Sequence, residues 1–282
     1  MKVILYNCIF FSILSFSINS CYTPRYVYSP SAQNIPLIHK KNDLEFSGFY
    51  SASLNRFKGK GDYNRGFDLQ SAWAISNHFA VMLNESAQWE KNGTNDTYYF
   101  GDTSRLSYRR NFVEIGLGYF SATRHSPKMQ VQVFGGAAFG ISDITDRYLS
   151  NNVEADKYHN SNVTKIFLQP ALLYSPLKNF SAAFSSRFTA VIFTHIHTNY
   201  TAEELDNYLL DSLTVSPVFF WEPAVSYAFG FKKFPVKFRV QGSLSVLINH
   251  RFIEHRSTNF GLGIFADFYK KNKSKSTSPK SS

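Results

Sequence analysis

Apolar and polar residues alternate over most of the chain between Leu44 and Phe268. Over 236–246, the even-numbered positions are apolar or small and the odd-numbered positions are polar. The stretches 180–192 and 259–268 repeat this period of two. Successive side chains of a β-strand point to opposite faces, whereas a helix would repeat its pattern every 3.6 residues. The pattern therefore predicts strands with one apolar face.

The same period predicts ten strands, an even number that favours an antiparallel up-and-down barrel. Their ranges are 44–54, 66–75, 78–88, 105–121, 128–140, 162–174, 180–195, 214–229, 236–248 and 258–268. The third strand is the weakest prediction, because Glu85 shares a face with Phe79, Val81 and Leu83.

The connections between these strands alternate in length. Short turns are predicted near 77, 122–127, 175–179 and 230–235, and longer polar loops near 55–65, 89–104, 141–161, 196–213 and 249–257. Outer-membrane barrels have tight periplasmic turns and longer outer loops, so we predict an all-β transmembrane barrel with both mature termini periplasmic. A lipid-carrying periplasmic barrel that does not span the membrane is the alternative, because period two also fits a strand buried in a sandwich.

The N-terminus carries a short apolar run. Lys2 precedes an apolar core that extends from Val3 to Phe16 and is interrupted by polar residues. A permanent transmembrane helix needs about 20 consecutive apolar residues. The run therefore predicts a cleaved signal peptide over residues 1–20.

The end of this run, Ile18-Asn19-Ser20-Cys21, resembles the lipobox of bacterial lipoproteins. The resemblance implies that the thiol of Cys21 carries a lipid and that the peptide is cut before it, with palmitate among the acyl chains. Each buried methylene contributes about 0.8 kcal/mol, so several chains make a stable anchor. An ordinary signal peptide cleaved near Ser20 is the alternative. Cys8 lies in the predicted signal, so the mature chain has a single thiol and no disulfide.

The predicted organisation is a signal peptide at 1–20, a lipidated extended linker at 21–43, a barrel at 44–269 and a basic tail at 270–282. This layout resembles that of outer-membrane β-barrel lipoproteins of the Bacteroidota, which are Gram-negative bacteria. The match covers about the first quarter of the chain and implies no function. Because residues 22–26 lack the acidic cluster of the surface-export signal in that group, the resemblance implies an anchor in the inner leaflet.

Alternation also places charges on the lumen side. They are Glu45, Asp68, Glu114, Glu222 and Asp267 beside Lys165, Arg187, Lys237 and Arg239. A charge in a narrow lumen loses solvation that only an opposite charge or hydrogen bonds replace, so these groups predict a network of paired charges and a plugged interior. A narrow pore for small solutes is the alternative.

Catalytic motifs are sparse. His195 and His197 alternate near the end of the seventh predicted strand, with acidic residues in the loop beyond, so a rim-located hydrolase or metal pair is conceivable. Thr201 and Glu204 are better explained as a capping box that starts a short helix ending near Leu210. No motif for a metal, a phosphate or another cofactor is present. We therefore predict a protein that is not an enzyme.

The formal charge of +10 is concentrated at the ends of the chain. Without Lys2 and the five lysines of the tail, 24 of the 30 basic residues remain against 20 acidic ones. No nucleic-acid module is present, and export makes one implausible. The predicted partners are outer-membrane lipids and, through the loops 141–161 and 196–213, a surface ligand or an envelope protein.

Overall fold

The computed structural model describes residues 25–53, 63–96, 102–124, 126–150, 153–177, 179–230, 236–249 and 253–268. Most of them form β-strands: β1 (Leu44–Ala52), β2 (Tyr63–Ala74), β3 (Phe79–Asp96), β4 (Asp102–Thr123), β5 (Ser126–Ser150), β6 (Val153–Leu177), β7 (Phe180–Thr198), β8 (Val218–Gly230), β9 (Val236–Leu244), β10 (Val246–Leu247) and β11 (Thr258–Phe268). The short helix α2 (Ala202–Asn207) and the 3-10 helix η1 (Asp211–Thr214) lie between β7 and β8.

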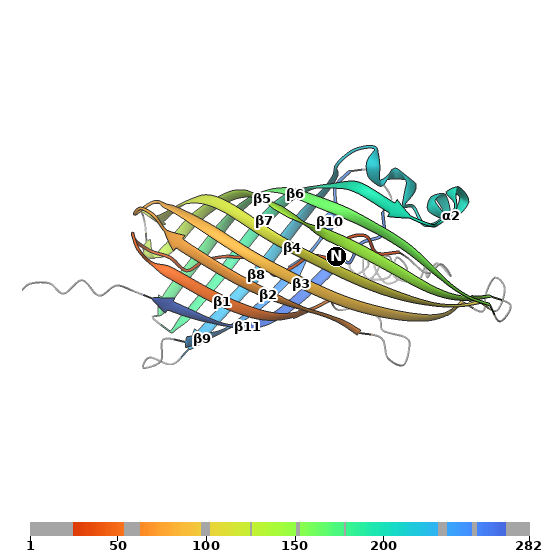
Figure 1. Ribbon diagram of the computed structural model, residues 1–282. Helices are drawn as coiled ribbons and strands as arrows, with labels where there is room; N and C mark the ends of the chain where they lie inside the picture. The colour runs from red at the N-terminus through yellow and green to blue at the C-terminus, as the bar shows by residue number, and fades with distance from the viewer. Residues whose placement is uncertain are drawn as a thin grey trace, which may run out of the picture.

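The strands form one closed antiparallel barrel (Figure 1). β1 to β8 pair in chain order, β11 joins β1 to β9, and the pairing of β9 with β8 closes the ring. β10 continues β9 beyond Ser245 and stays paired with β8. The described residues therefore form ten barrel strands, which confirms the predicted count and fold class.

The middle strands are longer than predicted. β4 has 22 residues, and β5 and β6 have 25 each, so most of the predicted loops 89–104 and 141–161 is strand. The reason is that apolar residues change from outward to inward positions along these strands. Val113 and Ile115 point outward, whereas Leu106, Tyr108 and Ile144 are buried inside. An apolar outer face therefore ends well before the strand does.

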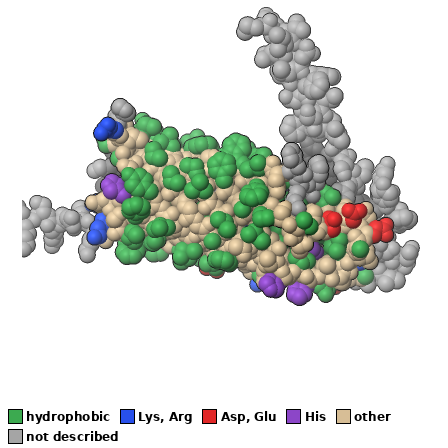
Figure 2. Space-filling view, turned by 90° about the horizontal axis from the view of Figure 1, so that it is seen from above, with side chains coloured by type: hydrophobic (Ala, Val, Ile, Leu, Met, Phe, Trp, Pro, Cys, Tyr) green, Lys and Arg blue, Asp and Glu red, His purple; other side chains and the backbone are tan. Residues whose placement is uncertain are grey.

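Every strand of the barrel carries exposed apolar side chains, which together form a belt around it. Figure 2 shows this belt on one face of the molecule. Leu69, Ile115 and Phe139 are 61%, 59% and 58% exposed. Trp73 and Trp89 lie at opposite margins of this belt on β2 and β3. Glu85 points outward within the belt, as the sequence predicted for the third strand. No described helix is long and apolar enough to cross a membrane.

The two ends of the barrel differ, and we name them by their connections. The short-turn end holds residues 75–78, Arg124 and Asn179, and the last described strand residue, Phe268, pairs there with Leu44. The long-loop end holds α2, η1, the last residues of β3 and β5 and the first residues of β4 and β6 (Figure 1).

Residues 25–38, which we call the lumen segment, run through the inside of the barrel. The sequence predicted an extended linker here. The segment is extended, but it is buried inside the barrel: Val27, Ile35 and Ile38 are 3%, 1% and 1% exposed. Arg25 contacts Asp146 at the long-loop end. At the other end, Asp43 pairs through its backbone with Ala74, beside a short turn. The described chain thus begins and ends at opposite ends of the barrel.

Three apolar clusters fill the rest of the interior. Ile38 packs with Met82, Phe120, Phe134 and Phe167, and Ile35 and Leu37 pack in a second cluster near Phe265. The third cluster, at the long-loop end, combines Val27 and Tyr28 of the segment with residues from the wall and from the α2–η1 connection. The interior is therefore a packed core.

Glycines make room for the aromatic members of this core. A Cβ atom on Gly118 would lie 2.3 Å from the Phe134 ring, whereas one on Gly135 would meet its nearest neighbour, the carbonyl of Phe167, at 3.6 Å. We expect Gly118→Ala to lower the free energy of unfolding by about 1–3 kcal/mol, because overpacking forces neighbours to shift. Gly135→Ala is the matched control and should be close to neutral. Urea-dependent loss of the heat-modifiable gel band measures both, and equal effects would contradict this account.

Candidate functional site

Glutamine side chains of the wall hold the lumen segment along its length. Six of them donate from Nε2 to six backbone carbonyl oxygens between Pro30 and Ile38, at 2.7–3.0 Å. The pairs are Gln88 to Pro30, Gln70 to Ala32, Gln241 to Gln33, Gln169 to Asn34, Gln132 to Pro36, and Gln130 to Ile38. We call these six residues the glutamine ladder. It gives the carbonyl oxygens of an inserted chain the N–H donors that a neighbouring strand would supply.

The segment's backbone donors are also used. The amide of Gln33 donates to Oε1 of Gln241 at 2.6 Å, so these two residues bond in both directions. The amide of Leu37 donates to Glu45 at 2.7 Å, and that of Val27 to the carbonyl of Glu254 at 3.0 Å. Buried backbone groups without partners are costly, so these contacts make the lumen a binding site for this segment.

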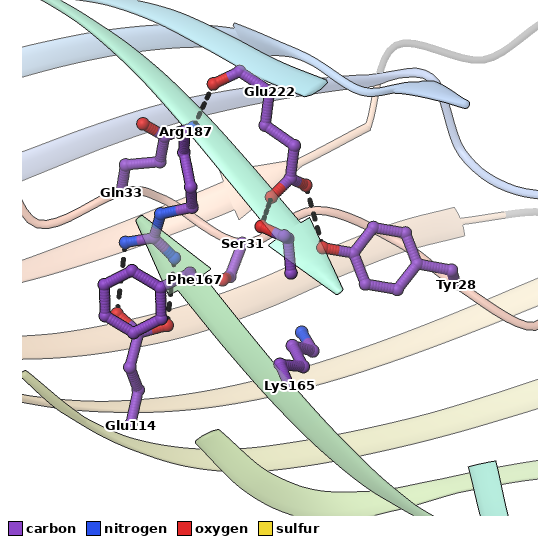
Figure 3. Close-up of a pocket in the computed structure, with 9 residues that line it drawn as sticks. Tyr28, Ser31, Gln33, Glu114, Lys165, Phe167, Arg187 and Glu222 are labelled. Atoms are coloured by element: carbon purple, nitrogen blue, oxygen red, sulfur yellow. Dashed lines mark hydrogen bonds and ion pairs between the residues drawn. The ribbon is translucent and has the colours of Figure 1, made fainter. Parts of the chain in front are cut away.

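A charged pocket lies beside the middle of the segment (Figure 3). Arg187 donates to both carboxylate oxygens of Glu114, at 2.9 and 3.1 Å, and its Nε donates to Gln169 at 2.7 Å. Its guanidinium carbon lies 4.4 Å from the centroid of the Phe167 ring. A buried arginine held by two carboxylate oxygens and an amide has fixed geometry, so it positions the ladder residue Gln169.

The other predicted charges of this pocket have different partners. Glu222 accepts hydrogen bonds from the hydroxyls of Tyr28 at 2.8 Å and Thr189 at 2.6 Å. Lys165 lies with its Nζ 3.6 Å from the centroid of the Phe112 ring. The space between these side chains is about 10 Å³, which is room for one water molecule. The segment therefore leaves no open passage at this level.

The remaining predicted lumen residues lie elsewhere. Asp68 accepts from Ser51 at 2.7 Å, and Arg239 pairs with Glu45 at 2.8 Å. Lys237 is half-buried, with its Nζ 5.1 Å from the centroid of the Phe265 ring. Asp267 pairs with Glu45 through the backbone, and its side chain lies outside the described residues. The predicted charges are thus divided into separate local groups, since hydroxyls and aromatic rings serve as partners besides opposite charges.

Sequence reasoning missed a second group of charges, at the long-loop end. Arg25 pairs with Asp146 at 2.5 Å, and its guanidinium carbon lies 3.9 Å from the centroid of the Tyr208 ring. The hydroxyl of Tyr200 donates to the same Asp146 at 3.2 Å. Nearby, Glu90 is paired with both Arg110 and Arg256. These contacts fix the start of the lumen segment beneath the α2 connection.

Two titratable groups near this end have shifted pKa values. Burial lowers the pKa of His159 to about 4, so its imidazole is neutral at pH 7. Burial alone would raise the pKa of Glu204, but the hydrogen bonds from Lys157 and Thr201 and the charge of Lys157 together outweigh it, and the pKa lies below its ordinary value. Both groups therefore keep one charge state between pH 5 and 8.

The histidine pair predicted near the rim does not sit on a regular strand. His195 has a positive φ of 48°, and the β6–β7 register shifts between Asn160 and Asn162. The alternation on which a metal pair depended is therefore interrupted. Within the described residues, no group of three or more His, Cys, Asp or Glu side chains is placed to hold a metal ion. The capping box of Thr201 and Glu204 is present at the start of α2, as predicted.

No model of a known protein family matches this chain, and no curated protein matches it either. Among solved structures, it is similar to Ail, the attachment invasion locus protein of Yersinia pestis, with 12% identity, a TM-score of 0.32 and coverage of 81% of this chain and 99% of that one. It is also similar to an outer membrane channel of Pseudomonas putida, with 9% identity, a TM-score of 0.40 and coverage of 84% of this chain and 100% of that one. A major outer membrane protein of Thermus thermophilus is 9% identical, with a TM-score of 0.36 and coverage of 80% of this chain and 99% of that one. Likenesses of this size do not assign a function.

Removing one partner of the buried ion pair between Arg187 and Glu114 should destabilise the folded protein. We expect Arg187→Met to lower the free energy of unfolding by about 3–5 kcal/mol, because it leaves Glu114 as a buried charge without its cation. The double variant Glu114→Gln with Arg187→Met should recover part of this loss. Arg147→Gln is the control, since its pair with Asp156 is 59% and 58% exposed and should contribute less than about 1 kcal/mol. Urea titration measures all three, and a loss at Arg187 no larger than at Arg147 would contradict the assignment.

Proposed function

We propose that this chain is a lipid-anchored β-barrel of the outer membrane, without catalytic activity, whose lumen is closed by its own N-terminal segment. The observation that carries the proposal is the glutamine ladder, which binds the lumen segment inside a closed barrel with an apolar belt. Its long-loop end would face the outside and meet a surface ligand or an envelope protein.

The orientation follows from the connections. Outer-membrane barrels keep short turns in the periplasm, so the short-turn end and the C-terminal end of β11 are proposed to be periplasmic. The sequence prediction placed the N-terminus of the mature chain there as well. The ion pair between Arg25 and Asp146 instead supports an N-terminus at the long-loop end, because the chain enters the lumen there and passes through it before β1 begins.

Chain length limits where a lipid on Cys21 could lie. Cys21 is four residues before Arg25, and four extended residues reach at most about 14 Å. The apolar band of an outer-membrane barrel is about 25 Å tall. With Arg25 bound to Asp146, an anchor in the inner leaflet is out of reach. We therefore propose that the lipid enters the outer leaflet, which departs from the anchoring that the family resemblance implied.

Labelling and surface access test this anchor. We expect palmitate to label the wild type but not Cys21→Ala. An epitope inserted between Cys21 and Arg25 should bind antibody on intact cells, whereas the same epitope after Phe268 should bind only in permeabilised cells. If neither epitope is accessible on intact cells, the proposed outer-leaflet anchor is wrong.

A narrow pore is the second candidate, because the fold is a closed barrel with charges inside. We expect the wild type to be silent in a planar bilayer, since the lumen segment fills the passage. Deletion of residues 25–38 should give measurable conductance while the heat-modifiable band is kept. Steady conductance of the wild type would favour the pore over the closed barrel.

A further inference from the structure

The outer wall carries basic side chains just above the apolar belt, over β2 to β4. Arg65, Lys91, Arg105 and Arg109 are all exposed, and we call them the basic wall patch. Arg65 lies opposite Trp89 in the β2–β3 register, and Trp89 lies opposite Arg109 in the β3–β4 register. The register thus places an aromatic ring between two cations on the same face.

Two residues of the patch, Lys91 and Arg109, line a hollow of about 330 Å³ in the outer surface. Tyr63, Trp89, Lys91 and Arg109 line it, together with Ser107, Tyr108, Thr145, Asn160, Glu90 and Asp143. Asp143 lies opposite Arg109 and offsets one charge, while the carboxylate of Glu90 is already paired inside the barrel. Two outward bases, Lys91 and Arg109, therefore line the hollow against one outward acid, and Arg65 and Arg105 lie on the same face beyond the lining, so the surface around the hollow is positive.

The position of the hollow matches the level of lipid headgroups. Phe67 follows Arg65 on the same face of β2, toward the short-turn end, and is 53% exposed. Val113 follows Arg109 on the same face of β4, also toward the short-turn end, and is 52% exposed. The patch therefore begins where the apolar belt ends. The guanidinium carbon of Arg65 lies 4.7 Å from the centroid of the Tyr63 ring, so an aromatic contact orients this cation.

We propose that the basic wall patch binds the headgroup of a phosphorylated glycolipid in the outer leaflet. Lys91 and Arg109 would contact phosphate, since arginine and lysine are the usual phosphate-binding side chains. Trp89 and Tyr63 offer ring faces on which a sugar can stack. This site would place an anionic lipid against the wall in the leaflet that the proposed orientation assigns to the long-loop end, and it rests on that orientation.

Binding of lipid A to the full chain in detergent tests the site, with native mass spectrometry as the readout. The triple variant R65Q/K91Q/R109Q should bind lipid A about tenfold or more weakly, because each basic side chain near a lipid surface contributes measurably. The triple variant K41Q/R124Q/K128Q removes the same charge at the short-turn end and should stay within about twofold of the wild type. Trp89→Ala should weaken lipid A but not phosphatidylglycerol, which has a phosphate and no sugar.

Several outcomes would overturn the proposal. They are an equal loss in the two triple variants, equal binding of dephosphorylated lipid A, and equal occupancy by phosphatidylglycerol or inorganic phosphate. Heat-modifiable migration of every variant verifies that the barrel is folded. Because the measurement is made in detergent, it does not depend on which end faces outward. The epitope experiment tests orientation alone, so the two proposals fail separately.

Discussion

The structure depends on hydrogen bonds between side-chain amides of the wall and the backbone of the lumen segment. A strand in a sheet obtains its partners from neighbouring backbone, whereas the backbone carbonyls of the segment between Pro30 and Ile38 accept from side chains of the wall. Glutamine suits this role because its amide both donates and accepts on a side chain long enough to reach inward. Gln241 uses both groups toward Gln33. Six such residues replace what a sheet edge would provide.

This arrangement lets the barrel wall carry apolar surface on its outer side while apolar side chains also fill its interior. Its outer belt is apolar, while Ile35, Leu37 and Ile38 of the segment supply apolar surface to the lumen. The charged groups are located between these clusters and at the long-loop end. There, the ion pairs of Arg25 and Glu90 are buried, so they are weakly screened and fix where the segment begins. The interior therefore combines a soluble-protein core with a barrel wall.

The sequence predicted the fold well where one outer face stays apolar. Strands such as β9 and β11 were found because period two places Phe238, Val240 and Ile264 outward. The extensions of β4 to β6 were missed, because apolar residues move to the inner face there and the outer face becomes polar. A two-phase search for alternation would have detected Ile144, which lies in the predicted loop 141–161, as an inward residue of β5.

The candidate site was less accessible from sequence. Inward Glu114 and Arg187 were identified by alternation, but their pairing required the register of β4 and β7 within a closed ring. The lumen segment was interpreted as a linker because Pro30 and Pro36 interrupt any regular pattern. One signal was available: Gln130, Gln132 and Gln169 occupy inward positions of neighbouring strands, and amides need partners when they are buried.

The lumen segment also constrains the order of assembly. It is held by side chains from β2 through β9, and the six glutamine contacts join residues that are 38 to 208 positions apart in the chain. The segment therefore has its complete set of partners only when strands from both halves of the chain are in place. Contacts between residues so far apart in sequence are slow to form, so we expect the last contacts of the segment to form after most of the wall.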